Sequence, residues 1–138
     1  MKSIPVGRVG LVIALDEGHR LARRRRVKLE ELAEDAFVAI PRHSGPSFHD
    51  LTIAACMEAG FSPRIMHYAK HFVSVVSLVA MGRGVSLVPR SFARAGVPGV
   101  VFKDIDGLVV EAEYSAVWNP ANTLPLLPHV LSLLGGKR

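Results

Sequence analysis

The sequence predicts an α/β fold, and three observations support this prediction. Short apolar runs that are typical of buried strands alternate along the chain with segments of helical periodicity. Glycine and proline residues separate many of these segments, as they do at turns. The chain has 138 residues, of which 49% are hydrophobic, which is enough apolar material for the core of one domain. Such alternation is typical of βαβ units, in which helices cover both faces of an open, mostly parallel sheet.

The first strand is predicted at residues 9–15, where VGLVIAL forms a continuous apolar run suited to burial on both faces. Residues 16–26 are polar and turn-like. Pro41 and Pro89 each follow a short apolar run and end the strand predicted there. Further strands are predicted at residues 37–40, 64–68, 85–88, 100–103 and 110–118.

The clearest helix is predicted at residues 71–81, where apolar residues recur at the spacing i, i+3, i+4 and i+7. The GRG segment that follows, residues 82–84, is interpreted as a helix stop and not as a phosphate-binding loop. Ser47 with Asp50 three residues later resembles a capping box, so a helix is predicted to begin at Ser47 and to close before Gly60. Other helices are predicted at residues 29–34, 91–95 and 124–134.

The charge of the chain favours polyanionic partners only weakly. Lys and Arg number 17 against 12 Asp and Glu, so the formal charge is +5 and the isoelectric point about 9.9. Four of these positive charges form one run, residues 23–26, and the rest of the chain is nearly neutral. The run contains no aromatic residue on which a base could stack, so we interpret it as a solvated basic turn. A patch that contacts phosphate groups is the alternative.

The sequence offers little for catalysis or metal binding. Cys56 is the single cysteine and is predicted to lie in the middle of a helix, away from the positions that activate a thiol. His67 and His71 have the spacing of a helical metal pair, but they straddle a predicted strand end and helix start. No paired carboxylates, nucleophile elbow or phosphate-binding loop is recognisable. We therefore expect a protein that is not an enzyme and that needs no metal and no cofactor.

The sequence favours a location in the cytoplasm. No apolar run approaches the roughly 18 residues that a membrane-spanning helix needs. The acidic residues Asp16 and Glu17 follow the first apolar run directly, and no cleavage site of an export signal is recognisable. A lone cysteine suits a reducing compartment.

The most informative local feature is the segment PRHSGPSF at residues 41–48. It follows a predicted buried strand and opens a helix, which is where open α/β sheets bind ligands. The free N–H groups of a helix start favour an anion such as a carboxylate. Ser44 and Ser47 add hydroxyl donors, and Phe48 adds an apolar wall. An ordinary capped helix start explains the same residues equally well.

Four short segments, each weak alone, point together to a known family. LDEGHRLA at residues 15–22 is similar to the motif D-x-H-P-L-A after a strand, and VKLEELA at 27–33 to V-x-L-x-D-L-A. EAGFSPR at 58–64 resembles A-G-F-x-P, and LVAMGRGVSLVP at 78–89 resembles L-V-A-A-G-x-G-I-x-L-L-P. In this order the motifs resemble the effector-binding domain of LysR-type transcriptional regulators. The GPSF segment at 45–48 resembles most the branch that regulates catechol, benzoate and chlorocatechol degradation, in which a Pro-x-Phe segment borders the effector pocket.

The chain departs from the family pattern at several positions. Arg20 stands where the family usually has proline, and Lys70 and His71 stand where that branch often has Arg-Glu. The buried charges of that branch are therefore in question here. The first part of lobe one and the winged helix-turn-helix that precedes it in the family have no counterpart in this sequence.

The resemblance implies a fold like that of type 2 periplasmic binding proteins, with one complete lobe and the C-terminal part of the other. It implies the following division of the chain: an N-terminal segment and first crossover strand at residues 1–15, lobe two at 16–98, a second crossover strand at 99–107, and the C-terminal strand and helix of lobe one at 108–138.

The resemblance also implies a function. The intact regulator would bind a small carboxylated inducer, of the kind formed in aromatic catabolism, between its lobes, and lobe closure would change how a tetramer bends promoter DNA. This chain is not expected to contact DNA or a membrane itself. The residues expected to form the lobe-two wall of the ligand pocket are Arg42, Ser44, Pro46, Ser47, Phe48 and Ser86. A ligand held from one side only should bind weakly, in the millimolar range.

Self-association is expected as well. The strand at 110–118 and the helix at 124–134 lack their family partners in this sequence, which leaves a strand edge and an apolar helix face uncovered. Exchange of these C-terminal segments between chains would cover them. Two other kinds of protein stay open as alternatives: a solute-binding protein of the same fold, and a small basic nucleic-acid-binding domain that uses residues 23–26.

Overall fold

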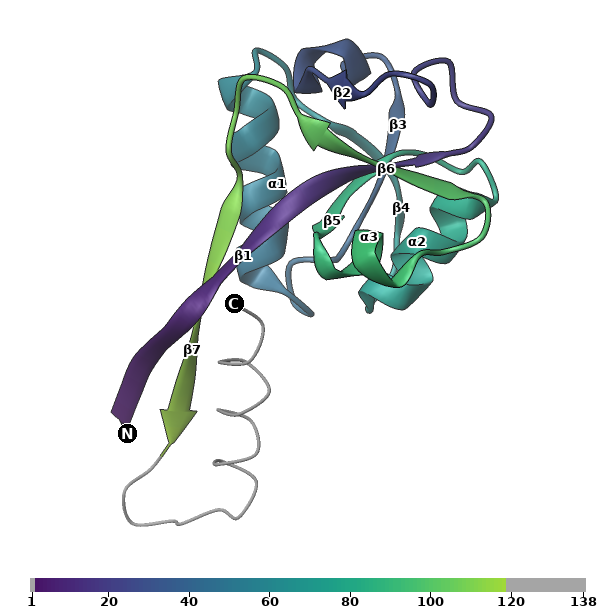
Figure 1. Ribbon diagram of the computed structural model, residues 1–138. Coiled ribbons are helices and arrows are strands. Elements are labelled where there is room, and N and C mark those ends of the chain that lie inside the picture. Colours follow the sequence, from purple (N-terminus) through teal and green to yellow (C-terminus); the bar gives the residue numbers. More distant parts are fainter. Residues whose placement is uncertain (1, 119–138) are drawn as a thin grey trace. The chain divides into compact units, whose positions relative to one another are not determined.

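A computed structural model describes the backbone of residues 2–118 and the side chains of residues 8–112 (Figure 1). The chain divides into two compact units, one formed by Met1–Val9 with Glu111–Arg138 and the other by Gly10–Val110. The second unit contains the helices that the structure describes and every residue of the predicted ligand site.

The secondary structure agrees with the sequence prediction in the order of its elements. They are β1 (Lys2–Asp16), β2 (Arg26–Val27), the 3-10 helix η1 (Leu29–Leu32), β3 (Ala36–Ala39), α1 (Pro46–Glu58), β4 (Arg64–Tyr68), α2 (Phe72–Ala80), β5 (Ser86–Pro89), α3 (Ser91–Ala95), β6 (Val100–Ile105) and β7 (Glu111–Trp118). The predictions for β4 and α3 match residue for residue. The short strand β2 was not predicted because it lies at the end of the polar run. The helix predicted at 124–134 lies outside the described residues.

The strands form a mixed sheet. One hydrogen-bonded path runs in the order β2-β6-β1-β5, with β7 also paired to β1, and β3 pairs with β4. Backbone bonds join the two sets, because the Val38 N–H donates to the Val85 carbonyl (2.8 Å) and the Val85 N–H donates to the Ala36 carbonyl (2.9 Å). The pairs β2–β6 and β3–β4 are parallel, whereas β1 runs antiparallel to both β5 and β6. The α/β fold class is therefore confirmed, with a reversed strand at its centre.

Residues 11–15 of β1 are buried on both faces, as the apolar run predicts. Leu11, Ile13 and Leu15 belong to one core cluster, which includes Ala55 and Cys56 of α1. Val12 and Ala14 point the other way, into a second cluster with the buried side of α2, where Val75, Val76 and Val79 confirm the predicted helical stripe. Figure 1 shows α1 on one side of β1 and α2 with α3 on the other. Burial of each of these large side chains stabilises the fold by roughly 1.5–3 kcal/mol before the entropy cost is counted.

The start of α1 differs from the prediction. The helix begins at Pro46, with Gly45 as the N-cap residue and no side-chain capping bond. The predicted capping box of Ser47 and Asp50 is therefore wrong, because proline suits the first helical position and moves the start by one residue. The Asp50 carboxylate instead lies 3.4 Å from the guanidinium of Arg42.

The ends of α1 and α2 follow one pattern. In α1 the Gly60 N–H donates to the Met57 carbonyl and the Phe61 N–H donates to the Cys56 carbonyl, both at 3.0 Å. In α2 the Gly82 N–H donates to the Val79 carbonyl at 2.9 Å. Both glycines have a positive φ, +100° at Gly60 and +76° at Gly82, which glycine adopts without steric cost. The interpretation of residues 82–84 as a helix stop is confirmed.

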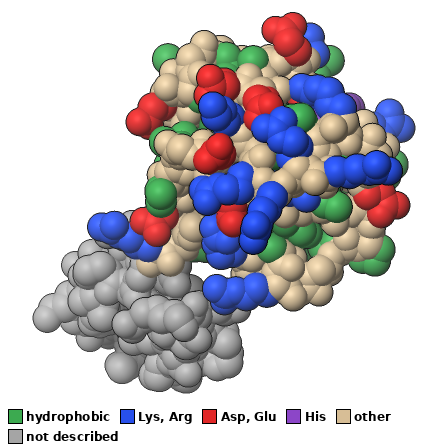
Figure 2. Space-filling view, turned by 45° about the horizontal axis from the view of Figure 1, so that its top comes forward, with side chains coloured by type: hydrophobic (Ala, Val, Ile, Leu, Met, Phe, Trp, Pro, Cys, Tyr) green, Lys and Arg blue, Asp and Glu red, His purple; other side chains and the backbone are tan. Residues whose placement is uncertain are grey.

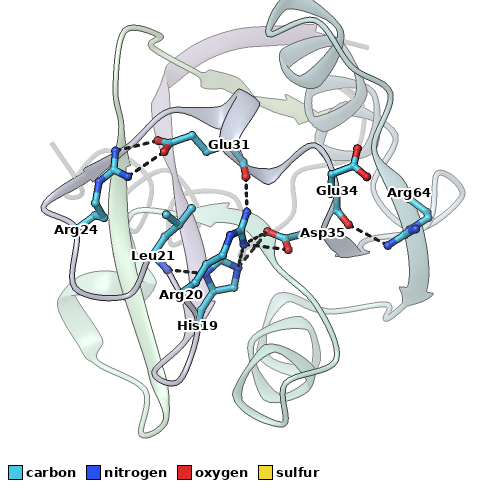
Figure 3. A network of polar contacts seen from close by, with 8 residues as sticks. All are labelled: His19, Arg20, Leu21, Arg24, Glu31, Glu34, Asp35 and Arg64. Carbon is cyan, nitrogen blue, oxygen red and sulfur yellow. Dashed lines mark hydrogen bonds and ion pairs between the residues drawn. The ribbon is translucent and has the colours of Figure 1, made fainter.

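A polar network fixes the segment between β1 and η1 (Figure 3). The Leu21 N–H donates to His19 Nδ1 (3.0 Å), which leaves the ring hydrogen on Nε2 facing Asp35 Oδ2 (3.0 Å). Arg20 binds the same carboxylate at 3.2 Å and donates to the Glu31 carbonyl at 2.6 Å. Arg20, which stands where the family that the motifs resemble usually has proline, thus adds an anchor to this turn.

The basic run is partly neutralised by acidic neighbours. The Arg24 guanidinium forms a bidentate ion pair with the Glu31 carboxylate, at N···O distances of 2.9 and 3.0 Å. Arg26 Nε lies 3.6 Å from Asp106 Oδ1. Arg23 and Arg25 are exposed. Figure 2 shows acidic side chains lying among the Lys and Arg side chains on this side of the molecule. This arrangement favours the interpretation of the run as a solvated turn over a phosphate-binding patch.

Replacement of Gly84 is expected to destabilise the fold. A Cβ at Gly84 would lie 2.8 Å from the Ala36 carbonyl oxygen, where β3 and β5 meet through backbone. Gly84→Ala should lower the free energy of unfolding by about 1–3 kcal/mol, measured by urea denaturation. Gly10→Ala is the matched control, because its nearest neighbour would be Arg90 Nε at an ordinary 3.6 Å. Equal urea midpoints for Gly84→Ala and the unmodified chain would contradict this account.

The Glu31 carboxylate should make stability depend on pH. The backbone N–H of Lys28, which donates to Glu31 at 3.0 Å, and the Arg24 ion pair lower the pKa of this carboxyl below its ordinary value. A group with a lowered folded-state pKa stabilises the fold above its unfolded pKa, and this stabilisation is lost as the pH falls through the folded pKa. Glu31→Gln should therefore flatten the loss of stability on acidification, followed by urea midpoints from neutral to acidic pH. Glu30→Gln is the matched control, because it removes an exposed carboxyl one residue away and leaves the bonds of Glu31 to Lys28 and Arg24 in place.

Candidate functional site

The segment predicted to bind a ligand lies where β3 ends and α1 begins. After Ile40 the chain turns back on itself, since the N–H groups of Ser44 and Gly45 donate to the Pro41 carbonyl at 3.0 and 3.1 Å. Gly45 packs against Ile40 so closely that a Cβ there would lie 2.9 Å from Ile40 Cγ2. The absence of a side chain at Gly45 therefore lets the loop fold against the strand and present the first turn of α1.

The first turn of α1 carries free backbone donors. The first hydrogen bond of the helical pattern is donated by the His49 N–H to the carbonyl of the N-cap residue Gly45 (2.9 Å). The N–H groups of Ser47 and Phe48 precede that bond, and Pro46 has no N–H. Two donors at the positive end of a helix dipole are suited to an anion such as a carboxylate.

Three helices begin at the same edge of the sheet. Strands β3, β4 and β5 run parallel to one another, and α1, α2 and α3 follow their carboxyl ends. Ring contacts confirm that the helix starts are neighbours. Phe48 in α1 and Phe72 in α2 have centroids 5.0 Å apart at an interplanar angle of 86°, and Phe72 and Phe92 in α3 have centroids 6.1 Å apart at 54°.

Sequence reasoning did not single out Phe72 and Phe92 as site residues. Phe72 belongs to the apolar stripe that predicts the helix at 71–81, and Phe92 falls in the helix predicted at 91–95. The signal that could have found them is positional, because each follows the end of a strand parallel to β3. His49 adds a further anchor to this edge, with Nδ1 3.1 Å from the Ile40 carbonyl and its ring stacked on Tyr68 at 6.2 Å.

The structure brings most of the predicted ligand-binding residues together. Arg42, Ser44, Pro46 and Ser47 are exposed on the loop and first turn of α1, and Phe48 beside them is partly buried. Arg42 shares its charge with Asp50, as described above.

Ser86 does not join this group. It opens β5 opposite Ala14 of β1 and is only 2% exposed, on the sheet face that α2 covers. Its hydroxyl has one long contact, at 3.5 Å, with the Leu87 carbonyl. The loop follows the carboxyl end of β3, whereas Ser86 lies at the amino end of the parallel strand β5.

Other polar and reactive residues are placed as follows. Burial raises the pKa of the Cys56 thiol to about 12, so very little thiolate forms at neutral pH. His67 and His71 are both exposed, and no cluster of metal-ligating side chains occurs among the residues that the structure describes. No helix between residues 2 and 118 has both the length and the apolar character needed to cross a membrane.

Two surface hollows lie away from this edge. One, of about 380 Å³, is lined by residues of η1, the end of α1 and the turn after β6. The other, of about 150 Å³, lies beside His19, Asp35 and Arg83. Neither is lined by the residues of the predicted ligand site.

Comparison with known proteins identifies the family. Residues 1–135 match the family described as LysR substrate binding domain. The chain is 35% identical over 127 residues to the HTH-type transcriptional regulator TtuA of Agrobacterium vitis, an alignment that covers 89% of this chain and 42% of TtuA. The chain thus spans less than half the length of that relative.

Solved structures show the same fold. CbnR, a LysR family transcriptional regulator, superposes with a TM-score of 0.78 at 24% identity, over 96% of this chain and 46% of CbnR. The effector binding domain of QuiR in complex with shikimate superposes with a TM-score of 0.69 at 19% identity, over 97% of this chain and 63% of that domain. The resemblance drawn from the sequence motifs is confirmed: the chain belongs to the LysR substrate-binding domain family, the ligand-binding regulatory part of LysR-type transcriptional regulators.

Proposed function

We propose that this chain binds a small carboxylated effector at the edge where α1, α2 and α3 begin. The observation that carries the proposal is the contact between Phe48 and Phe72, at 5.0 Å, because it holds the starts of α1 and α2 side by side. Two helix N-termini that meet at one edge present several free N–H groups and two positive dipole ends to the same ligand.

The surrounding side chains suit an acid with an apolar body. Lys70 is exposed next to the start of α2 and adds positive charge, and the exposed Arg42 next to the start of α1 shares its charge with Asp50. The three phenylalanine rings offer an apolar surface beside the donors. QuiR holds shikimate, a cyclic carboxylic acid, in a domain of the same fold, which supports a ligand of this chemistry.

We further propose the role of this chain within a complete regulator. Gly10–Val110 would contain lobe two, residues 16–98, the second crossover strand at 99–107 and the last part of the segment 1–15 with the first crossover strand. The C-terminal strand and helix at 108–138 would belong to lobe one. Effector binding between the lobes would shift an equilibrium of lobe closure and so change how a cytoplasmic tetramer bends promoter DNA. The DNA itself would be contacted by the winged helix-turn-helix of the complete regulator.

Small carboxylates should raise the thermal stability of this chain. At ten times its dissociation constant, a ligand that binds only the folded state stabilises it by about 1.4 kcal/mol, which raises the melting temperature by several degrees. Benzoate and muconate at millimolar concentration test this in thermal unfolding. Ser47→Ala and Phe48→Ala should reduce the shift, whereas Ser77→Ala, a change on the exposed part of α2, should retain it. An unshifted melting temperature with every carboxylate would overturn the proposal.

Self-association through the C-terminal segments should be visible by sedimentation equilibrium. The unmodified chain should show dimers or larger species whose fraction rises with protein concentration. Deletion of residues 119–138 should shift the distribution toward monomer. A monomeric mass for the unmodified chain at high concentration would contradict exchange of C-terminal segments.

A further inference from the structure

A row of three phenylalanine rings lines the proposed ligand edge, and its middle member is Phe72. We propose that Phe72 determines specificity, by favouring carboxylates that carry a flat ring over open-chain carboxylates of similar size. This inference rests on the proposed function, since it concerns the ligand of the same site.

Phe72 is the ring that contacts both of the other phenylalanines. It is the first residue of α2, directly after the N-cap residue His71. It contacts Phe48 almost perpendicularly, at 86°, and Phe92 at 54°. Phe48 packs against the core cluster under α1 and Phe92 against the cluster under α2. Phe72 therefore links two aromatic side chains that belong to different cores.

The geometry of the row favours a ligand ring over an alkyl chain. All three phenylalanines are only partly buried and so remain partly accessible. Aromatic rings attract one another at centroid distances of about 4.5–7 Å in edge-to-face or offset arrangements, beyond what area burial alone provides. A ligand ring that lies next to Phe72 would extend the row in this way. An alkyl chain has no quadrupole and gains only the contact area.

The carboxylate and the ring are recognised by different groups. The carboxylate is common to all candidate ligands and is assigned to backbone N–H groups, which a change at Phe72 leaves in place. The ratio of two affinities, for an aromatic and an open-chain acid, thus isolates the contribution of the ring contact. Benzoate and hexanoate form such a pair, because both carry one carboxylate and a hydrocarbon body of similar size.

The test is a titration of the chain with each acid, followed by ¹H–¹⁵N correlation spectra. Phe72→Leu keeps an apolar side chain over the core but removes the ring. It should weaken benzoate binding by about 2- to 10-fold and change hexanoate binding by less than about twofold. The matched control is Phe61→Leu, which breaks an aromatic pair with Phe37 (6.1 Å) at the far end of α1 and should leave the ratio unchanged.

A second measurement on the unmodified chain does not depend on how the variants fold. Nuclear Overhauser effects are expected between the ring protons of bound benzoate and those of Phe72. If the unmodified chain binds both acids but shows no such effects, or if Phe72→Leu leaves the ratio unchanged, the role of Phe72 is refuted and the ligand site stands. If the unmodified chain binds neither acid, the proposed function fails and the inference fails with it.

Discussion

The fold depends on one constraint, the burial of residues 11–15 of β1 on both faces of the strand. Leu11 through Leu15 are at most 3% exposed, and alternate side chains enter the two core clusters. A one-residue slip of this strand would exchange the two sets of side chains, so its register with β5 and β6 is strongly specified. Once β5 is placed, its backbone contacts position β3, and β3 in turn positions β4. The shared edge at which α1, α2 and α3 begin follows from that order.

The proposed ligand edge depends on few specialised residues. Gly45 allows the loop to fold against Ile40, and Pro46 sets the first helical position of α1. The same end of the sheet then gathers helix starts that the parallel order of the strands makes neighbours. Free backbone donors arise there because every α-helix leaves its first N–H groups unpaired. The aromatic rings are side chains that the sequence places in the first turns of the three helices. The free N–H groups at this edge thus follow from the order and direction of the strands, and a few side chains add apolar surface and charge to them.

Local sequence patterns predicted most elements because each had a local physical cause. The apolar stripe of α2 and the run VGLVIAL indicate which side chains are buried. Gly60 and Gly82 adopt the positive φ at which α1 and α2 end. The capping box at Ser47 failed because proline at position 46 competes for the helix start. Strand β2 could not be predicted, because two residues become a strand only when β6 pairs with them over a long sequence separation.

The sequence by itself determined the α/β class, the family and the turn that leads from β3 into α1, since these depend on periodicity and short motifs. Only the tertiary structure decided that Phe72 and Phe92 stand beside Phe48, and that Ser86 lies away from the loop on the face beneath α2. The physical reason is that the order and direction of the strands decide which helix starts lie next to one another. Both arise from hydrogen bonds between segments far apart in the chain, which local patterns do not record.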